Sequence, residues 1–320
     1  MNPGRVLVTG WPSFIHGEAT AGDVLAMEAV REELTRVAVE CELAWSPVFR
    51  PGALTLDEAD PARYTHLVFA CGPLQGQDIE RLHRRFSGCR RVAVGVSVVD
   101  IADPAAAGFH VILPRDGSGV PPMGDLASVP EPERTPEMVP VAGVIRVGGQ
   151  AEYPRRARHE AVSTALTQWL DGCGCALVPL DTRLDPRDWR LCGVPAELEA
   201  IIGRLDLVIT MRMHGLVLAL KHGVPALAID PVAGGAKVTA QAQAWQWPAV
   251  VTVGLDEASE EALDPGRLDE WRDWCLSPAG RDAARRAAQS PPPSPLGGLL
   301  AALEPGFQHA AEGRGPYVAK

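Results

Sequence analysis

The residues with the clearest chemical potential in this 320-residue chain lie close together, between positions 206 and 237. An apolar run that ends at Thr210 is followed by Met-Arg-Met-His, so Arg212 and His214 stand two residues apart. On an extended backbone, two such side chains point the same way. Arginine carries a permanent charge with forked donors, and histidine titrates near neutral pH. The pair is therefore suited to holding an anion and moving a proton.

Two hydrophobic runs and a helix must position this pair. The spacing predicts a strand over 205–210, a helix over 215–222 and a second strand over 225–230. A helix that begins beside Arg212 and His214 favours a bound anion. The loop after the second strand contains Gly234, Gly235 and Lys237. Its glycines permit a close approach of the backbone to a ligand.

A structural interpretation competes with this functional one. Arg212 could form an internal ion pair and His214 could be a core residue with satisfied hydrogen bonds. Trp245 and Trp247 follow the lysine loop and could stack on a sugar ring, although tryptophans more often belong to a core.

The whole chain alternates strand and helix patterns, which indicates an α/β protein with parallel sheets. The predicted strands are 5–9, 65–70, 91–96, 109–113, 141–146, 176–180, 205–210 and 225–230. The predicted helices are 24–36, 76–86, 159–170, 195–204, 215–222 and 266–289. Residues 119–140 are rich in Pro and charge, which is typical of a linker. We therefore predict an N-terminal Rossmann-like domain over 1–135 and a C-terminal one over 136–290. A Pro- and Gly-rich tail follows over 291–320.

This pattern predicts two Rossmann-like domains that face each other across a cleft, a GT-B-like architecture. Ligands of such sheets bind at the carboxyl ends of the strands.

Composition excludes several classes of protein. The net charge of −10 disfavours non-specific binding of nucleic acid, and no apolar run is long enough to span a membrane. The seven cysteines are scattered, and Cys173 with Cys175 makes a poor zinc pattern. No other cluster of metal ligands stands out, so no metal is expected. The first residues lack a signal-peptide pattern, so we expect a cytoplasmic protein.

The stretch around Arg212 resembles the polysaccharide pyruvyl transferase family. The hallmark of that family is a hydrophobic strand, R-x-H, a helix, a G-V-P strand and a following lysine. Its counterparts in this sequence are Arg212, His214, Gly223-Val224-Pro225 and Lys237. Weaker matches follow the family order and extend the resemblance over about residues 5–250: Gly22-Asp23, the turn Cys71-Gly72-Pro73, Arg115-Asp116-Gly117-Ser118 and Gly124-Asp125-Leu126-Ala127.

The resemblance implies transfer of pyruvate from phosphoenolpyruvate to two hydroxyls, which forms a ketal and releases phosphate. It implies His214 as acid and base, Arg212 and Arg115 as donor clamps, and Lys237 as a phosphate partner. Phosphoenolpyruvate is then a co-substrate and no further cofactor is expected. Further substrate-binding candidates are His16, Asp23, Gly72, Gly234 and Gly235, of which Asp23 also fits a helix N-cap.

The sequence departs from the family mainly in its N-terminal half. The loop before Gly22-Asp23 lacks the usual Asn, and a triple-glycine turn is reduced to Cys71-Gly72-Pro73. The resemblance implies that the acceptor, a sugar or a small secondary metabolite, binds to the N-terminal domain and the donor to the C-terminal one. These changes therefore concern the acceptor more than the donor. Two other functions remain open. One is a GT-B-like glycosyltransferase that uses a nucleotide sugar, and the other is a non-catalytic binding or partner subunit of the same fold.

Overall fold

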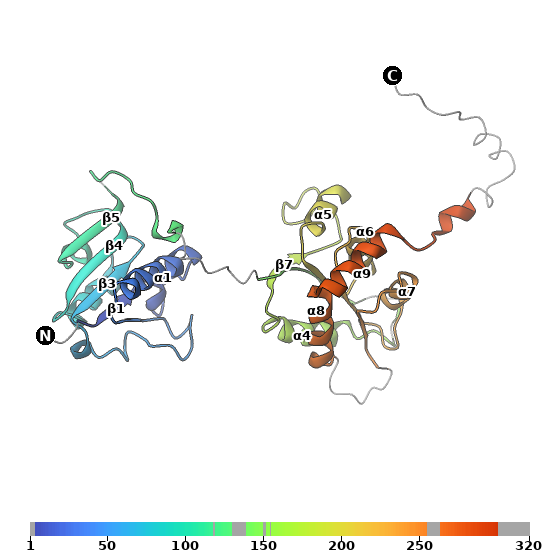
Figure 1. Ribbon diagram of the computed structural model, residues 1–320, viewed down its shortest axis with the longest axis horizontal. Coiled ribbons are helices and arrows are strands. Elements are labelled where there is room, and N and C mark those ends of the chain that lie inside the picture. Colours follow the sequence, from blue (N-terminus) through green and yellow to red (C-terminus); the bar gives the residue numbers. More distant parts are fainter. Residues whose placement is uncertain are drawn as a thin grey trace, which may run out of the picture. The chain divides into compact units, whose positions relative to one another are not determined.

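A computed structural model gives the structure of the chain and describes residues 4–117, 119–129, 139–149, 152–153, 155–254 and 263–299. The chain divides into two compact units, Met1–Thr135 and Pro136–Lys320. Figure 1 shows both units, and each is described here by itself. No helix in the described ranges is long and apolar enough to cross a membrane.

The N-terminal unit is built on a five-stranded sheet in which every pairing is parallel. The strand order is β2-β1-β3-β4-β5. The strands are β1 (Val6–Thr9), β2 (Cys41–Leu43), β3 (His66–Ala70), β4 (Arg90–Val98) and β5 (Val111–Gly117). The helices are α1 (Ala21–Arg36), α2 (Gln77–Arg85), α3 (Pro104–Ala107), and the short 3₁₀ turns η1 (Trp11–Ser13), η2 (Pro61–Arg63) and η3 (Leu126–Ser128).

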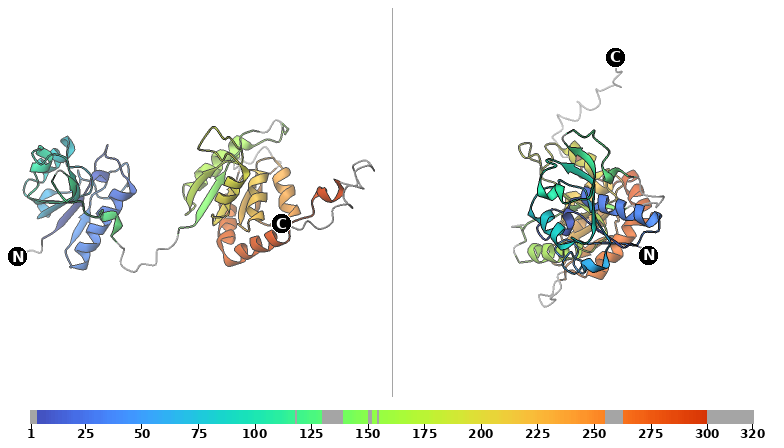
Figure 2. Two further views of the ribbon diagram at one scale, coloured as in Figure 1. Left: turned by 90° about the horizontal axis from the view of Figure 1, so that it is seen from above. Right: turned by 90° about the vertical axis from the view of Figure 1, so that its left-hand side faces the viewer.

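Alternation along β1 explains how this unit buries both faces of its sheet. Val6 and Val8 pack in one cluster with Met27 of α1, whereas Leu7 packs in another with Ile79 of α2. Successive side chains of a strand point to opposite faces, so α1 and α2 cover opposite sides of the sheet. Figure 2 shows these two helices on either side of the strands.

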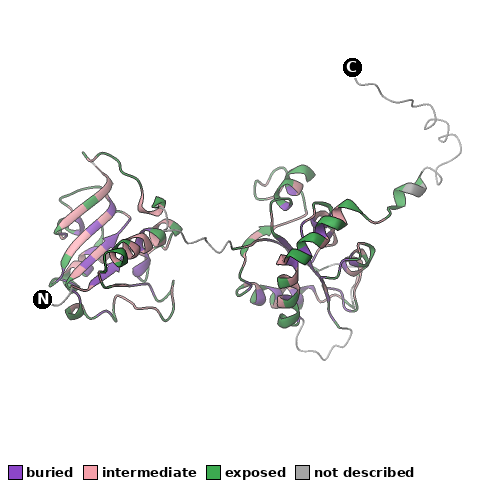
Figure 3. Ribbon diagram, in the orientation of Figure 1, coloured by how far each residue is buried: buried purple, intermediate pink, exposed green. Residues whose placement is uncertain are grey.

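The C-terminal unit repeats this plan with a second parallel sheet, in the order β10-β9-β8-β6-β7. Its strands are β6 (Val141–Ile145), β7 (Ala176–Leu180), β8 (Leu207–Thr210), β9 (Ala226–Asp230) and β10 (Val250–Thr252). Its helices are α4 (His159–Leu170), α5 (Pro195–Ile202), α6 (Met213–Lys221), α7 (Lys237–Ala244), α8 (Pro265–Leu276), α9 (Pro278–Gln289) and the 3₁₀ turn η4 (Pro295–Gly298). Strands β8 and β9 are buried along their whole length, as Figure 3 shows for the centre of the unit.

Both sheets therefore place their first strand between the second and the third. The chain therefore reverses its direction across each sheet between the first and the third strand. In sheets of this kind, ligands bind beside the carboxyl ends of these two strands. In the C-terminal unit these strands are β6 and β8. The predicted α/β class with two Rossmann-like units is confirmed, whereas a cleft between the units stays a prediction.

Several boundaries differ from the sequence prediction. The short strands β2 and β10 and the helices α3 and α7 were not predicted. The helical stretch expected over 266–289 is two helices, because Ser277 ends α8 and caps α9, whose first residue is Pro278. The helix expected over 24–36 begins at Ala21. Much of the predicted linker (130–138) and the tail beyond residue 299 lie outside the described residues.

Candidate functional site at the carboxyl edge of the C-terminal sheet

The junction between β8 and α6 is shaped by the hydroxyl of Thr210. This buried side chain accepts a hydrogen bond from the Arg212 backbone N–H and donates one to the Arg212 carbonyl, both at 2.9 Å. Arg212 is the extended N-cap of α6, and His214 already lies in the helix. The expectation that both residues lie on one extended backbone is therefore wrong, because the chain turns into a helix between them.

Gly215 makes this tight junction possible. A Cβ at this position would lie 2.2 Å from Thr210 Oγ1 and 3.0 Å from Ile145 Cδ1. Any side chain would push the first turn of α6 away from β8. The glycine after the R-x-H motif is thus a positioning residue that we had not predicted, and its place directly after the histidine was the available signal.

The structure brings three predicted residues together. Arg212, exposed His214 and Lys237 line one cavity of about 210 Å³ at the ends of β8 and β9. The remaining lining consists of Met211, Met213, Asp230, Pro231, Val232 and Val238. A guanidinium, an ammonium group and an imidazole therefore line this space, together with the buried carboxylate of Asp230. The cavity can bind a small anion and exchange a proton with it.

Asp230 fixes the loop that carries Lys237. Its fully buried carboxylate accepts hydrogen bonds from the backbone N–H groups of Val232, Ala236 and Thr239, and from the Thr239 hydroxyl, at 2.7–3.1 Å. Thr239 lies in the first turn of α7, so Asp230 replaces a missing N-cap side chain. Sequence analysis noted Asp230 only as the end of a strand.

The glycines of the same loop turn the chain rather than line the cavity. Gly234 and Gly235 adopt φ of +75° and +80°. Arg156 donates hydrogen bonds to the carbonyls of Ala233 and Gly235 at 2.7 and 2.6 Å. Lys237 Nζ lies 3.4 Å from Glu152 Oε1, an exposed pair that a stronger anion can replace.

A second cavity, of about 560 Å³, borders Arg212 and follows the ends of β6 and β7. Arg212 Nε donates to the Arg146 carbonyl at 3.3 Å, and its Nη2 lies 3.9 Å from Asp181 Oδ1. Burial raises the pKa of Asp181, but hydrogen bonds from Arg183 and the charges of Arg183 and Arg212 outweigh it, so the net pKa is lowered. Arg146, Asp181 and Arg183 are site candidates that sequence analysis missed. Their position at the end of a predicted strand (Arg146) or just beyond one (Asp181 and Arg183) was the signal that could have found them.

Arg115 belongs to the N-terminal unit and is heavily engaged there. Its guanidinium donates to Asp116 and Ser97, each at 2.8 Å, and to Asp125. The Asp116 hydrogen bond is the largest cause of a raised pKa of Arg115. Binding of a donor by Arg115 therefore requires exchange of these partners, and its predicted role as a clamp stays a prediction. Ser118, which belongs to the same predicted motif, lies outside the described residues.

The other N-terminal candidates occupy separate places. Thr20, not Asp23, is the N-cap of α1, and the Thr20 hydroxyl donates to the Asp23 carboxylate at 2.6 Å. The N-cap assignment of Asp23 is therefore wrong by three residues, because the Thr20 hydroxyl accepts the hydrogen bond from the Asp23 backbone N–H at 3.2 Å. Exposed His16 lines a cavity of about 350 Å³ with Phe14, Leu56 and Leu82 among others. Gly72 turns the chain after β3 with φ of +77°, packed against Trp11.

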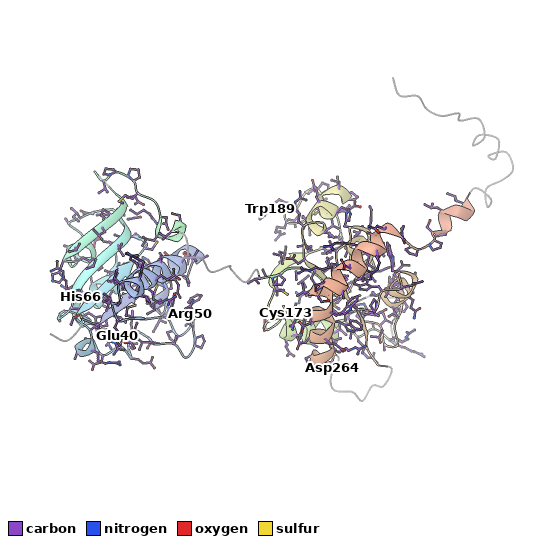
Figure 4. All side chains as sticks on the ribbon, in the orientation of Figure 1. Glu40, Arg50, His66, Cys173, Trp189 and Asp264 are labelled. Carbon is purple, nitrogen blue, oxygen red and sulfur yellow. The ribbon has the colours of Figure 1, made fainter. Side chains whose placement is uncertain are left out.

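The tryptophans after the lysine loop pack inward. Trp247 is buried and donates to the Ala226 carbonyl at 2.7 Å, so it belongs to the core and is not a stacking platform for a sugar. Trp245 is partly buried against the same core. Trp189 is 92% exposed and is labelled in Figure 4.

Within the described ranges, no group of three His, Cys, Asp or Glu side chains could hold a metal.

Comparison with known proteins gives a partial family match and distant structural neighbours. Spinosyn rhamnosyltransferase SpnG in complex with spinosyn aglycone is 15% identical, with 93% of this chain and 99% of that chain covered and a TM-score of 0.34. UDP-GlcNAc 2-epimerase from Methanocaldococcus jannaschii is 9% identical, with 88% of this chain and 98% of that chain covered and a TM-score of 0.30. The glycosyltransferase SnogD from Streptomyces nogalater is 13% identical, with 93% of this chain and 99% of that chain covered and a TM-score of 0.30. These values are too low to inform on substrate. No curated protein matches the chain significantly.

The family match falls on the site itself. Residues 177–231 match the family described as polysaccharide pyruvyl transferase. This segment includes Asp181, Arg212, His214 and Asp230, which are among the residues that border the two cavities at the ends of the strands. The match supports a transferase, and it confirms the resemblance of this chain to the polysaccharide pyruvyl transferases.

Proposed function

We propose that the protein transfers pyruvate from phosphoenolpyruvate to two hydroxyls of a sugar or small-molecule acceptor. The observation that carries this proposal is the convergence of Arg212, His214 and Lys237 on one small cavity, because two of these residues lie in the segment that matches the family. A doubly anionic donor needs fixed cations, and an enol needs a proton donor.

The reaction sets clear demands on the site. A proton adds to the methylene carbon C3 of the donor, and an acceptor hydroxyl forms a bond to C2. The bond between C2 and the phosphate oxygen breaks, and a second hydroxyl then adds to C2 to close the ketal. The two hydroxyls lose two protons in all, of which one balances the new methyl group and the other leaves on hydrogen phosphate.

The described residues fit these demands. The forked guanidinium of Arg212 is suited to the donor carboxylate, and Lys237, which lines the same cavity as His214, can compensate further negative charge of the donor. His214 is exposed on the first turn of α6, where it can give a proton to C3 and take one from a hydroxyl. Arg115 is a further proposed clamp, on the strength of the resemblance alone.

Phosphate release tests the proposal directly. The full chain is incubated with phosphoenolpyruvate and a panel of sugars, nucleotide sugars and small diols, and the products are followed by ³¹P NMR and mass spectrometry. We expect release of phosphate that depends on an acceptor, together with an acceptor product that has gained a pyruvyl ketal. Consumption of a nucleotide sugar without phosphoenolpyruvate would contradict the proposal.

A glycosyltransferase remains the second candidate because of one specific observation. Asp181 follows β7, the neighbour of the first strand β6, and borders the 560 Å³ cavity. An acidic residue at this point of a Rossmann-like sheet is suited to binding ribose hydroxyls. Asp181 is, however, already paired with Arg183 at 2.7 Å. The same assay separates the two functions, since a glycosyltransferase releases a nucleoside diphosphate instead of inorganic phosphate. A non-catalytic partner subunit would consume neither donor.

A further inference from the structure

His159 is a buried histidine without a hydrogen-bond partner. The residue is 4% exposed, and among the described residues neither Nδ1 nor Nε2 finds a partner. Burial is the largest cause of the lowered pKa of its imidazole; the charge of Lys237 adds to this effect, and the charges of Asp230 and Glu152 oppose it. A buried polar group without a partner is costly and calls for an explanation, of which an absent ligand is one.

The position of His159 points to such a ligand. It is the first residue of α4, a helix of 12 residues, and no described side chain caps the first turn. The first intrahelical hydrogen bond runs from the Val162 N–H to the Arg158 carbonyl, so the preceding N–H groups of this turn have no acceptor within the helix. These groups and the helix dipole favour an anion.

The same helix turn borders the 560 Å³ cavity. Arg146, Gly148 and Gly149 follow β6 and line the cavity from one side, while His159, Glu160, Ser163 and Thr164 line it from α4. Arg212 lines both this cavity and the 210 Å³ cavity that contains His214. A ligand that contacts both cavities would therefore pass Arg212.

The charges around this cavity favour a phosphate. Three arginines (Arg146, Arg183 and Arg212) face two carboxylates (Glu160 and Asp181). Asp181 is compensated by its pairs with Arg183 at 2.7 Å and Arg212 at 3.9 Å. Glu160 is exposed to solvent, where its charge is screened. A neutral imidazole can still donate one hydrogen bond to a phosphate oxygen.

We propose that the first turn of α4, with His159, Arg146 and Arg183, binds the phosphate group of a substrate. The assignment of that phosphate to phosphoenolpyruvate rests on the proposed function. In this arrangement Arg212 lies between the two halves of the donor, and the carboxylate and vinyl group lie on the His214 side. His159 is then a binding residue for phosphate rather than an acid or base.

The test is binding of inorganic phosphate, which needs neither turnover nor an acceptor. Phosphate, phosphoenolpyruvate and uridine diphosphate are titrated by isothermal calorimetry into the full chain and into His159→Leu, with His222→Leu as the control at the far end of α6. Leucine removes both unpartnered nitrogens, so the fold should keep or gain thermal stability. We expect phosphate and phosphoenolpyruvate affinity to fall about 10-fold or more in His159→Leu and to stay unchanged in His222→Leu.

Unchanged phosphate affinity in a folded His159→Leu would overturn the proposal. If this variant fails to fold, ¹⁵N-detected titration of the wild-type imidazole with phosphate gives the answer, because binding must shift the His159 ring nitrogens. Lack of any shift would also overturn it. Binding of phosphate that depends on His159, without turnover of phosphoenolpyruvate, would keep this subsite and refute the proposed function. Turnover of phosphoenolpyruvate, together with phosphate binding that does not depend on His159, would keep the proposed function and refute this subsite. Tighter binding of uridine diphosphate than of phosphoenolpyruvate would assign the phosphate to a nucleotide.

Discussion

The two units use the same strand order but treat their arginines differently at the carboxyl edge. In the N-terminal unit, Arg115 of β5 is held by Asp116, Asp125 and Ser97. In the C-terminal unit, the guanidinium of Arg212 has one long hydrogen bond to a carbonyl and a 3.9 Å ion pair. A saturated arginine stabilises its surroundings, whereas a loosely held one beside a cavity is available to a ligand.

Histidines show the same contrast. Half-buried His83 of α2 has its Nε2 2.8 Å from the Ala105 carbonyl. Buried His159 has no partner in the described part of the chain, and His214 is exposed to the cavity. Unpartnered buried polar atoms occur in both units, among them Thr9 Oγ1 and His83 Nδ1, but within the described residues only His159 has two of them. His159 also borders a cavity, as a binding residue does. We therefore expect the donor to bind to the C-terminal unit.

The largest effect on turnover is expected from His214, which we assign a role in the reaction and no role in holding the fold together. His214→Gln should lower turnover about 10²- to 10⁴-fold, because it removes the proposed acid and base. His222→Gln changes a histidine at the other end of α6, paired with Glu199 at 3.2 Å, and should leave turnover unchanged. Steady-state phosphate release measures both. Equal turnover of His214→Gln and the wild type would remove the imidazole from the mechanism.

Asp230 is a group of the C-terminal unit that, like Arg115 in the N-terminal unit, is held by several hydrogen bonds. Asp230→Ala leaves three backbone N–H groups and one hydroxyl without their acceptor and should lower the free energy of unfolding by about 3 kcal/mol. Asp230→Asn keeps one acceptor oxygen and should cost less. Urea denaturation measures the loss, and a loss below about 1 kcal/mol in Asp230→Ala would show that the loop does not depend on this carboxylate.

Replacement of Arg115 and Arg212 in turn measures how much each arginine contributes to stability. Arg115→Ala should lower the free energy of unfolding by about 2 kcal/mol, since it breaks hydrogen bonds to two carboxylates. Arg212→Ala should change it by less than about 1 kcal/mol, since its ion pair is long at 3.9 Å and its hydrogen bond to the Arg146 carbonyl is 3.3 Å. Calorimetric unfolding of both variants in the same buffer is the measurement. A larger loss in Arg212→Ala than in Arg115→Ala would reverse the assignment of structural and available arginines.

The smallest effect concerns acid stability. Burial lowers the pKa of His159 in the folded protein below the value of about 6.5 expected for an unfolded chain. The unfolded state therefore binds more protons between these two values, and stability falls as pH drops below about 6.5. His159→Leu should lose less stability than the wild type between pH 7 and 5, by at most about 1.4 kcal/mol for each pH unit. Parallel melting curves in both proteins would contradict a buried, neutral His159.

Sequence periodicity was sufficient for the long elements but not for the short ones. The apolar runs that became β3, β6, β8 and β9 are buried in the sheets, and helix α4 has the predicted bounds. Strand β2 has three half-buried residues, and α7 carries mostly small and polar residues, so neither gave a clear period. Tertiary contacts decide such segments.

The candidate site divides in the same way. Arg212, His214 and Lys237 were predictable because a motif carries them, and they share a cavity. His159, Arg146 and Asp181 were not, because each is a single residue whose meaning depends on the strand that ends beside it. Gly215 gains its role only from the distance of 2.2 Å that a Cβ would leave to Thr210 Oγ1. Sequence spacing does not contain such distances.

The most direct test of the central claim is a calorimetric titration of phosphoenolpyruvate into the wild type and Arg212→Ala, with Arg204→Ala as the control. Arg204 bonds only to a backbone carbonyl among the described residues. The account predicts saturable binding that is about 10- to 100-fold weaker in Arg212→Ala, because hydrogen bonds to a charged ligand are lost, and unchanged in Arg204→Ala. No binding to the wild type, or equal affinity in Arg212→Ala, would contradict a phosphoenolpyruvate site at this edge of the sheet.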